Sequence, residues 1–222
     1  GVDLVIGKYS EVLADAAKAK LRMHSIAMLT GKDGSVTQTG LFIVRQNDPA
    51  KSIADLGGRK ILLGPVSSQE KHAAALAALE AFALPMPRPL QIKSSCNTAA
   101  MAIVEKQADA AVISSYAMPL LEGCGTIDKG ALRIVGRTDP VPFIGVFVSD
   151  RVSVESENHL LRALLAARNH PDLLTALESK EGFLRVPALG GSARTPAAGV
   201  RSFVARAHAR LPVTSSSKRR LS

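Results

Sequence analysis

Serine pairs stand at three places where an apolar run ends and a helical pattern begins. The pairs are Ser67-Ser68, Ser94-Ser95 and Ser114-Ser115. A serine at a helix start can cap the helix while other backbone N–H groups there stay free, and these donors together with the helix dipole suit an anion. One such unit is most often an ordinary capped helix. Because the carboxyl ends of strands in an α/β sheet gather at one edge, the three pairs together predict one anion site built of neutral donors.

The motifs that mark hydrolases are absent from the sequence. It contains no Gly-x-Ser-x-Gly, no Gly-x-x-x-x-Gly-Lys and no His-Glu-x-x-His. Hydrolysis needs an activated nucleophile or a metal cage, whereas binding an oxyanion needs only well-placed donors once water is excluded. We therefore predict a binding protein that is not an enzyme and needs no cofactor.

A soft metal site is the alternative chemistry. His72, Cys96 and Cys124 carry the imidazole and thiolate groups that such ions prefer, although the two cysteines lack zinc-type spacing and equally allow a disulfide or two free thiols. The simpler interpretation is a solvent-facing Glu70-Lys71-His72 turn beside one buried thiol. We expect Cys96, at a helix start, to be the more reactive cysteine because its thiol pKa would be lowered. A metal or metalloid sensor using His72 and Cys96 remains the alternative function.

The elements that would position these residues alternate between short apolar runs and helical patterns, which is typical of an α/β fold. The expected strands are residues 2–6, 25–29, 37–45, 60–63, 90–93, 109–113, 131–137 and 143–149. The expected helices are residues 10–20, 50–56, 68–83, 98–107, 116–122, 154–168, 171–179 and 195–211. The last helix carries an apolar stripe from Val200 to Leu211, and we expect that stripe to pack against the body.

The composition is globular, with 46 % hydrophobic residues in a chain of 222 residues. No apolar run approaches the ~18 residues of a membrane span, and no signal peptide is visible. Every Asp and Glu precedes residue 185, so the net charge of +9 is concentrated in a basic tail whose residues 212–222 we expect to be disordered. With no Trp we expect no nucleic-acid partner, and a nucleic-acid role of the tail is a third hypothesis.

Three segments taken together resemble the periplasmic phosphate/phosphite/phosphonate-binding proteins of ABC importers, which have the type 2 solute-binding fold. The segments are TGLFIVRQNDPAKSIADLGGRKILLGPVSS, AAMAIVEKQADAAVISSYAMPLL and LRIVGRTDPVPFIGVFVSD. The resemblance implies two α/β lobes with mixed sheets. Residues 47–141 would form one lobe, and residues 1–46 with 142–211 would form the other. The hinges would lie near residues 41–45 and 140–147.

The resemblance also implies which residues bind the ligand. By position, the family's binding loops fall on Ser67, Ser68, Gln69, Ser95, Cys96, Asn97, Ser114, Ser115, Lys8 and Tyr9. The family often has an acidic residue where Ser114 stands. The neutral Ser114, together with Lys8, therefore favours a plain oxyanion over an aminoalkylphosphonate.

The family's other properties are expectations of the same kind. The ligand would be a small phosphate-, phosphite- or phosphonate-like anion, and the partner would be an ABC transporter permease. The location would be periplasmic or extracytoplasmic, and the protein would be a monomer. Family members have strands and helices before the segment that matches Val2–Ile6, so the first lobe is expected to be incomplete in this chain.

Overall fold

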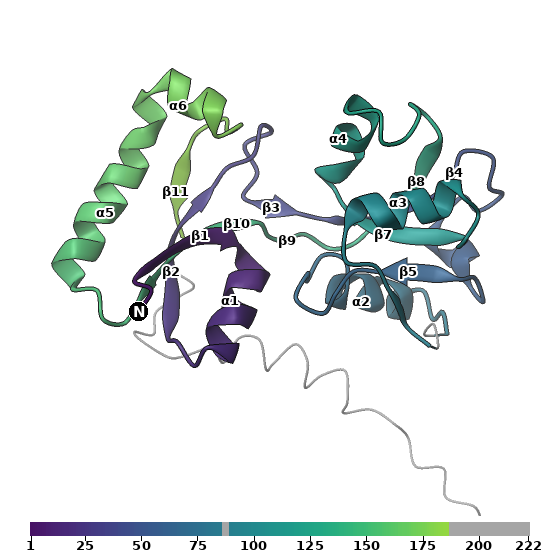
Figure 1. Ribbon diagram of the computed structural model, residues 1–222, viewed down its shortest axis with the longest axis horizontal. Coiled ribbons are helices and arrows are strands. Elements are labelled where there is room, and N and C mark those ends of the chain that lie inside the picture. Colours follow the sequence, from purple (N-terminus) through teal and green to yellow (C-terminus); the bar gives the residue numbers. More distant parts are fainter. Residues whose placement is uncertain (86–88, 187–222) are drawn as a thin grey trace, which may run out of the picture. The chain divides into compact units, whose positions relative to one another are not determined.

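The computed structural model describes residues 1–85 and 89–186, drawn in colour in the ribbon diagram (Figure 1). In these residues the chain forms a five-stranded sheet, a four-stranded sheet and a two-stranded sheet, with helices against the two larger ones. The fold is therefore a mixed α/β fold with several sheets, as the sequence predicts.

The five-stranded sheet has the strand order β6-β5-β7-β4-β8. The strands are β4 (Gly40–Arg45), β5 (Ile61–Leu63), β6 (Gln91–Ile92), β7 (Ala110–Ser114) and β8 (Leu132–Arg137). Strand β5 is parallel to β6 and β7, whereas β4 is antiparallel to β7 and β8. The three parallel strands are neighbours, so their carboxyl ends, which precede the three serine pairs, lie at one edge of the sheet.

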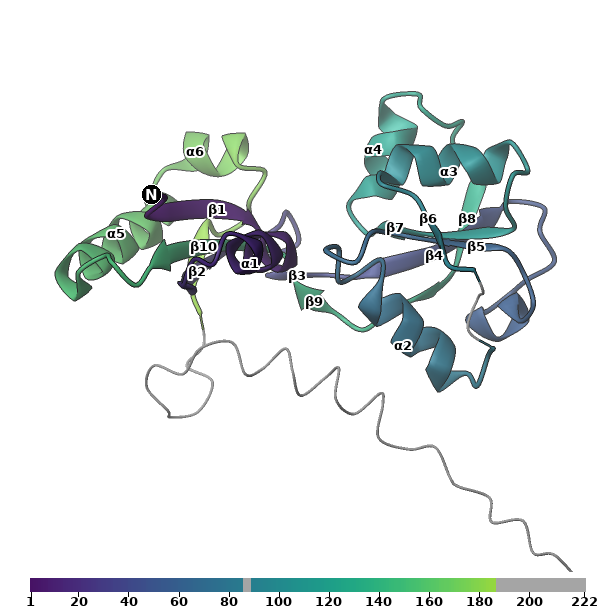
Figure 2. The same cartoon turned by 60° about the horizontal axis from the view of Figure 1, so that its bottom comes forward.

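Helices cover both faces of this sheet, with α3 (Cys96–Val104) and α4 (Ala117–Gly123) on one face and α2 (Ala73–Ala81) on the other (Figure 2). Successive side chains of β4 belong to two hydrophobic clusters, one on each face of the sheet. Leu41 and Ile43 pack in the cluster under α3 and α4, whereas Phe42 and Val44 pack with the short helix η1 (Ile53–Leu56) and α2. Successive side chains of a strand point to opposite faces, so a strand buried on both faces has an unbroken apolar sequence.

The four-stranded sheet is antiparallel, with the strand order β1-β10-β2-β11. Its strands are β1 (Leu4–Lys8), β2 (Met23–Leu29), β10 (Ile144–Ser149) and β11 (Phe183–Arg185). The helices of this part are α1 (Tyr9–Lys18), α5 (Val154–Ala166), η2 (Ala167–Asn169) and α6 (Pro171–Ala176). Helix α1 follows strand β1 without a loop, so Lys8 at the end of β1 lies close to Glu11 in the first turn of α1.

The connection between the two larger sheets differs from the expected hinges. Strand β3 (Thr37–Gln38) pairs with β9 (Val141–Pro142), while β4 is an inner strand of the five-stranded sheet. The predicted single strand 37–45 is interrupted before Gly40, whose N–H donates to Thr138 Oγ1 at 2.8 Å. The chain therefore passes between the two larger sheets near residue 39, and the crossing strands are β3 and β9.

The start of α2 also differs from the prediction. The helix begins at Ala73, with His72 as an N-cap that makes no side-chain bond, rather than at Ser67 or Ser68. Before it, residues 66–72 form successive turns in which the N–H groups of Lys71 and His72 donate to the carbonyl of Ser68 at 3.1 and 3.0 Å. The prediction that Ser67 or Ser68 caps a helix is wrong because these turns bring Glu70, Lys71 and His72 inward.

Among the described residues, no helix is long and apolar enough to cross a membrane. The predicted helix 195–211 and the predicted disordered end 212–222 lie outside the described residues.

Candidate functional site

A hollow of about 420 Å³ lies beside the carboxyl ends of the parallel strands. Residues from β1 and α1 line it on one side, and residues that follow β5, β6 and β7 line it on the other. Its lining residues are Lys8, Glu11, Lys71, Ser94, Ser95, Cys96, Asn97, Tyr116, Ala117, Leu120, Leu121 and Cys124. Its volume is suited to a small ligand.

The ammonium of Lys71 is the first notable feature of this hollow. The residue is only 5 % exposed, yet within residues 1–85 and 89–186 no carboxylate lies at ion-pair distance from Nζ. Its polar neighbour is the thiol of Cys96, with 4.0 Å between Nζ and Sγ. Gly64 makes room for the Lys71 stem, since a Cβ there would lie 3.0 Å from Cε of Lys71. A buried cation that lacks an anionic partner is costly, so this position favours an anion.

The amino-terminal end of α3 faces the same hollow. Ser95 caps this nine-residue helix by accepting a hydrogen bond from the Thr98 N–H at 3.1 Å. The N–H groups of Cys96 and Asn97 occupy the first turn, where a helix offers no acceptor of its own. These donors add to the positive end of the helix dipole, so they suit an anion next to Lys71.

A buried ion pair connects the two sides of the hollow. Glu70 is fully buried, and its Oε1 accepts hydrogen bonds from Ser114 Oγ at 2.6 Å and from Lys8 Nζ at 3.2 Å. Burial alone would lower the pKa of Lys8, but the charges of Glu70, Tyr116 and Glu11 and the hydrogen bond to Glu70 together raise it. Lys8 is therefore held as a cation, 5.6 Å from the ring centre of Tyr116.

A second pair of contacts joins the same segments. Ser68, which is 1 % exposed, donates its hydroxyl to Glu11 Oε1 at 2.9 Å. The backbone N–H of Gln69 donates to Ser10 Oγ at 3.4 Å. The turn 66–72 is thus attached to the start of α1 by both side chains and backbone.

The predicted site residues fall into two groups. Lys8, Ser95, Cys96 and Asn97 line the hollow, whereas Tyr9, Ser67, Ser68, Gln69, Ser114 and Ser115 do not. The hydroxyls of Ser68 and Ser114 donate hydrogen bonds to carboxylates. The hydroxyl of Ser115 accepts a hydrogen bond from the N–H of Thr39 at 3.3 Å. Of the three serine pairs, Ser94-Ser95 is the one that lines the hollow.

The interpretation of Glu70, Lys71 and His72 as a solvent-facing turn is wrong, because all three are buried. A carboxylate and an ammonium consequently join the site, although Ser114 alone suggested a neutral one. The signal in the sequence was the charged run Glu70-Lys71-His72 after the Gly64-Pro65 break and the serine pair, inside a segment predicted to approach the ligand. Helical spacing gave no indication of which face these residues occupy, because the helix begins only at Ala73.

Tyr9 serves as a packing residue. Its ring lies 4.9 Å from that of Phe147, and burial raises the pKa of its phenol. Tyr116, which lines the hollow, stacks on Phe143 with 5.3 Å between ring centres. Phe143 directly follows β9, so the wall of the hollow is coupled to the strands that connect the two sheets.

The metal alternative has little geometric support. His72 is 9 % exposed, and its Nδ1 is bonded to the carbonyl of Gly64 at 2.8 Å. In the part of the chain that the structure describes, no group of three His, Cys, Asp or Glu side chains is arranged to hold a metal ion. Both cysteines are free thiols. A thiol pKa below its usual value is found at the exposed Cys124, chiefly because Thr126 hydrogen-bonds to its sulfur.

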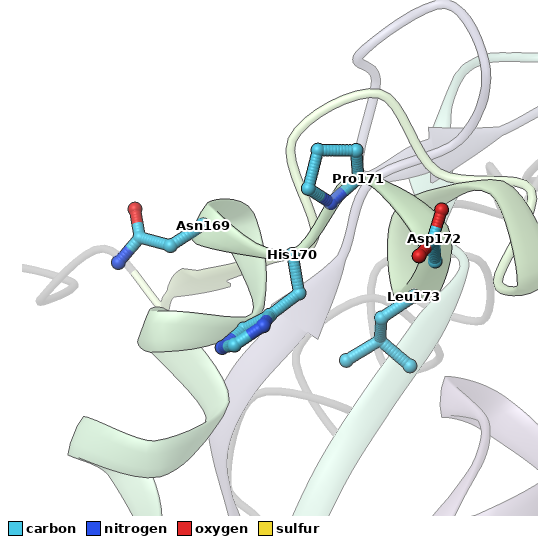
Figure 3. A pocket seen from close by; sticks show the side chains of 5 residues that line it. All are labelled: Asn169, His170, Pro171, Asp172 and Leu173. Carbon is cyan, nitrogen blue, oxygen red and sulfur yellow. The ribbon is translucent and has the colours of Figure 1, made fainter.

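Another hollow, of about 440 Å³, lies at the start of α6. Its walls are the five consecutive residues 169–173, which run from the end of η2 into α6 (Figure 3). Helix α6 has only six residues, and this hollow holds none of the cations described above. The hollow around Lys71 is therefore the better candidate site.

Comparisons with known proteins identify the family of this chain. Residues 7–187 match the family model described as "ABC transporter, phosphonate, periplasmic substrate-binding protein". A search of curated proteins finds no match.

Solved structures share the fold at low sequence identity. A binding protein component of an ABC phosphonate transporter from Pseudomonas aeruginosa has a TM-score of 0.66 at 16 % identity, covering 83 % of this chain and 64 % of that one. PhnD1 from Prochlorococcus marinus, in complex with methylphosphonate, has a TM-score of 0.66 at 11 % identity, covering 93 % and 78 %. The periplasmic aliphatic sulphonate binding protein SsuA from Escherichia coli has a TM-score of 0.57 at 17 % identity, covering 84 % and 69 %.

The fold is that of the type 2 periplasmic binding proteins. The chain belongs to the phosphonate-type substrate-binding proteins of ABC transporters, because the family model spans most of its length. Proteins of this family are periplasmic, bind small anions for a membrane permease and are not enzymes.

Proposed function

We propose that this protein binds a phosphate-, phosphite- or phosphonate-like oxyanion in the hollow around Lys71 and delivers it, as a monomer, to the permease of an ABC transporter. The observation that carries the proposal is the buried ammonium of Lys71, which no carboxylate neutralises among the described residues. The free N–H groups at the start of α3 lie on the same hollow. A tetrahedral oxyanion would use both, since charged donors and backbone N–H groups bind phosphoryl oxygens strongly.

The two sheets would act as the two lobes of the binding protein. Lys8 and Glu11 come from the part with the four-stranded sheet, and the other lining residues come from the part with the five-stranded sheet. A ligand that contacts both parts would hold them together, with β3 and β9 as the crossing strands.

Titration calorimetry with phosphate, phosphite and methylphosphonate tests the proposal. At least one of these anions should give saturable heat. Lys71→Met should then weaken binding by about 10- to 150-fold, which corresponds to the ~1.5–3 kcal/mol of a hydrogen bond to a charged group. Lys51→Met is the matched control because Lys51 is exposed and lies outside the hollow.

Two results would contradict the proposal. One is the absence of binding of all three anions to a protein whose circular dichroism shows that it is folded. The other is an unchanged dissociation constant in folded Lys71→Met.

A further inference from the structure

Helix α4 gives the hollow a wall whose chemistry differs from that of Lys71. This wall, called the α4 wall, consists of Tyr116, Ala117, Leu120, Leu121 and Cys124, which α4 and its two caps contribute. The spacing i, i+1, i+4, i+5 and i+8 puts these residues on one side of the helix. None of them is a Lys, Arg, His, Asp or Glu. The hollow therefore has a largely apolar wall as well as a cationic one.

Leu120 is the most exposed apolar residue of the α4 wall. Its exposed fraction is 56 %, whereas Ala117 and Leu121 are buried in the hydrophobic cluster beneath α3 and α4. A single exposed leucine is common on protein surfaces and needs no explanation. Here, however, Leu120 lies together with the half-exposed Tyr116 in a hollow that also contains a buried ammonium. Apolar side chains beside a few convergent polar groups are typical of sites for organic ligands.

Cys96 connects the α4 wall to the buried ammonium. Its Sγ lies 4.0 Å from Lys71 Nζ, and its side chain packs against the cluster that contains Ala117 and Leu121. Helices α3 and α4 lie on the same face of the five-stranded sheet (Figure 2). A group bonded directly to an oxyanion at Lys71 therefore has the α4 wall as its neighbour on the side of Cys96.

The size of the hollow leaves room for such a group. A tetrahedral anion with five heavy atoms occupies on the order of 150 Å³, if each atom takes about 30 Å³, the share of one water molecule in the liquid. The hollow has a volume of about 420 Å³. A bare anion at Lys71 would therefore leave most of the hollow, and the exposed side chain of Leu120, in contact with water.

We propose that the ligand is an oxyanion that carries an apolar organic substituent of several carbon atoms, and that Leu120 is the residue that selects for this substituent. Lys71 and the N–H groups at the start of α3 bind the anionic head, and the substituent lies on Leu120 and Tyr116. This inference rests on the proposed function and narrows its substrate class, because inorganic phosphate and phosphite would not be the preferred ligands.

The same wall disfavours a cationic substituent. An alkylammonium group would lose its hydration against Leu120 and find no carboxylate on the α4 wall. Glu11, which α1 contributes to the hollow, already accepts a hydrogen bond from Ser68 and is paired with Lys8. The apolar and the ammonium forms of one substituent should therefore bind with different affinities.

Titration calorimetry on the full chain at one neutral pH tests the proposal with methylphosphonate and propylphosphonate. The two anions have the same head and differ by two methylenes. Each methylene that leaves water tightens binding about fourfold, so propylphosphonate should bind about tenfold more tightly when the two are incompletely buried. The heat capacity change of binding should also be more negative for propylphosphonate, because it buries more apolar surface.

Propylphosphonate and 2-aminoethylphosphonate form a second matched pair. They have the same number of heavy atoms, and an ammonium in one replaces a methyl group in the other. The ammonium form should bind at least about tenfold more weakly, since its desolvation on the α4 wall is not compensated.

Leu120→Gln tests the residue itself. Glutamine keeps the helix propensity of leucine but removes the apolar surface, so the preference for propylphosphonate over methylphosphonate should shrink to about threefold or less. Leu173→Gln is the matched control, because it removes an exposed leucine from α6, outside this hollow, and should keep the wild-type preference.

The possible failures are distinguishable. If the folded wild-type protein binds neither these phosphonates nor phosphate and phosphite, the proposed function fails. If it binds methylphosphonate and propylphosphonate equally, or 2-aminoethylphosphonate as tightly as propylphosphonate, the inference about the substituent is wrong while anion binding stands. If folded Leu120→Gln keeps the full preference, the selection does not come from Leu120. If Leu120→Gln does not fold, the two comparisons on the wild-type protein decide the matter.

Discussion

Lys8 is the one cation at ion-pair distance from Glu70 in residues 1–85 and 89–186, and Lys8→Met removes it. Glu70 is 0 % exposed and the Lys8 side chain is 17 % exposed, so solvent screens this pair poorly. Removing one partner of a buried ion pair leaves an uncompensated charge, which typically costs about 3–5 kcal/mol. For a chain of this size that loss corresponds to a decrease in melting temperature of roughly 6–20 °C.

The double variant Lys8→Met/Glu70→Gln separates the lost charge pair from lost packing. Without the carboxylate, no buried charge remains unpaired, so the double variant should be more stable than Lys8→Met alone. Urea unfolding followed by circular dichroism measures these free energies, since the chain has no Trp to report by fluorescence. Lys18→Met is the control, because the Lys18–Asp15 pair is 74 % exposed on both sides and should contribute almost nothing.

If Lys8→Met were as stable as the wild-type protein, the buried Lys8–Glu70 pair would not stabilise the fold. If the double variant were less stable than Lys8→Met, the penalty would not come from an unpaired carboxylate.

Three further predictions follow from particular contacts. The pKa of Lys8 is raised in the folded protein, so the stabilisation by its ion pair is complete below the unfolded-state pKa of 10.5 and is lost as the pH rises through the higher folded-state pKa. The free energies of unfolding of wild type and Lys8→Met, measured with urea, should therefore converge at strongly alkaline pH. A difference that stays constant with pH would contradict this. Gly40→Ala should lower the free energy of unfolding by about 3 kcal/mol, because the new Cβ would collide with the backbone oxygen of Glu70 and lie 2.9 Å from Val112 Cγ1. In the same unfolding assay Gly123→Ala is the control and should be tolerated, since a Cβ there meets nothing within 4 Å. Cys124 is exposed and its thiol pKa is lowered, so iodoacetamide should alkylate it before the half-buried Cys96. Peptide mass spectrometry measures the two labelling rates. Faster labelling of Cys96 would contradict this and would make Cys96 the more reactive cysteine.

Much of the fold could be predicted because apolar runs and helical patterns are local signals. The strand before the first serine pair, the buried strand that ends at Ser114 and the helix capped by Ser153 all appear close to the expected positions. The arrangement of the parallel strands at one edge was also predictable, since it follows from alternating strands and helices. The family resemblance predicted two connecting stretches near residues 41–45 and 140–147, and the strands that pair between the two larger sheets are β3 and β9.

The site was harder to predict because it depends on contacts between distant segments. Lys8 and Glu70 are 62 positions apart, and Ser114 and Glu70 are 44 positions apart. Whether Ser68 caps a helix or bonds to Glu11 is decided by the packing of α1, which local propensity does not contain. Sequence patterns predicted ligand contacts for Ser68 and Ser114, whose hydroxyls bond to carboxylates in the structure, and gave no sign that Lys71 is buried beside the hollow.

The proposed function depends on an oxyanion that binds between Lys71 and the start of α3. Methylarsonate is a tetrahedral analogue of methylphosphonate, and anomalous diffraction from crystals of its complex would locate the arsenic atom directly. If the oxyanion binds there, the crystals should show one arsenic site within hydrogen-bonding reach of Lys71 Nζ and the backbone N–H groups of Cys96 and Asn97. An arsenic site elsewhere, with this hollow filled only by water, would contradict it.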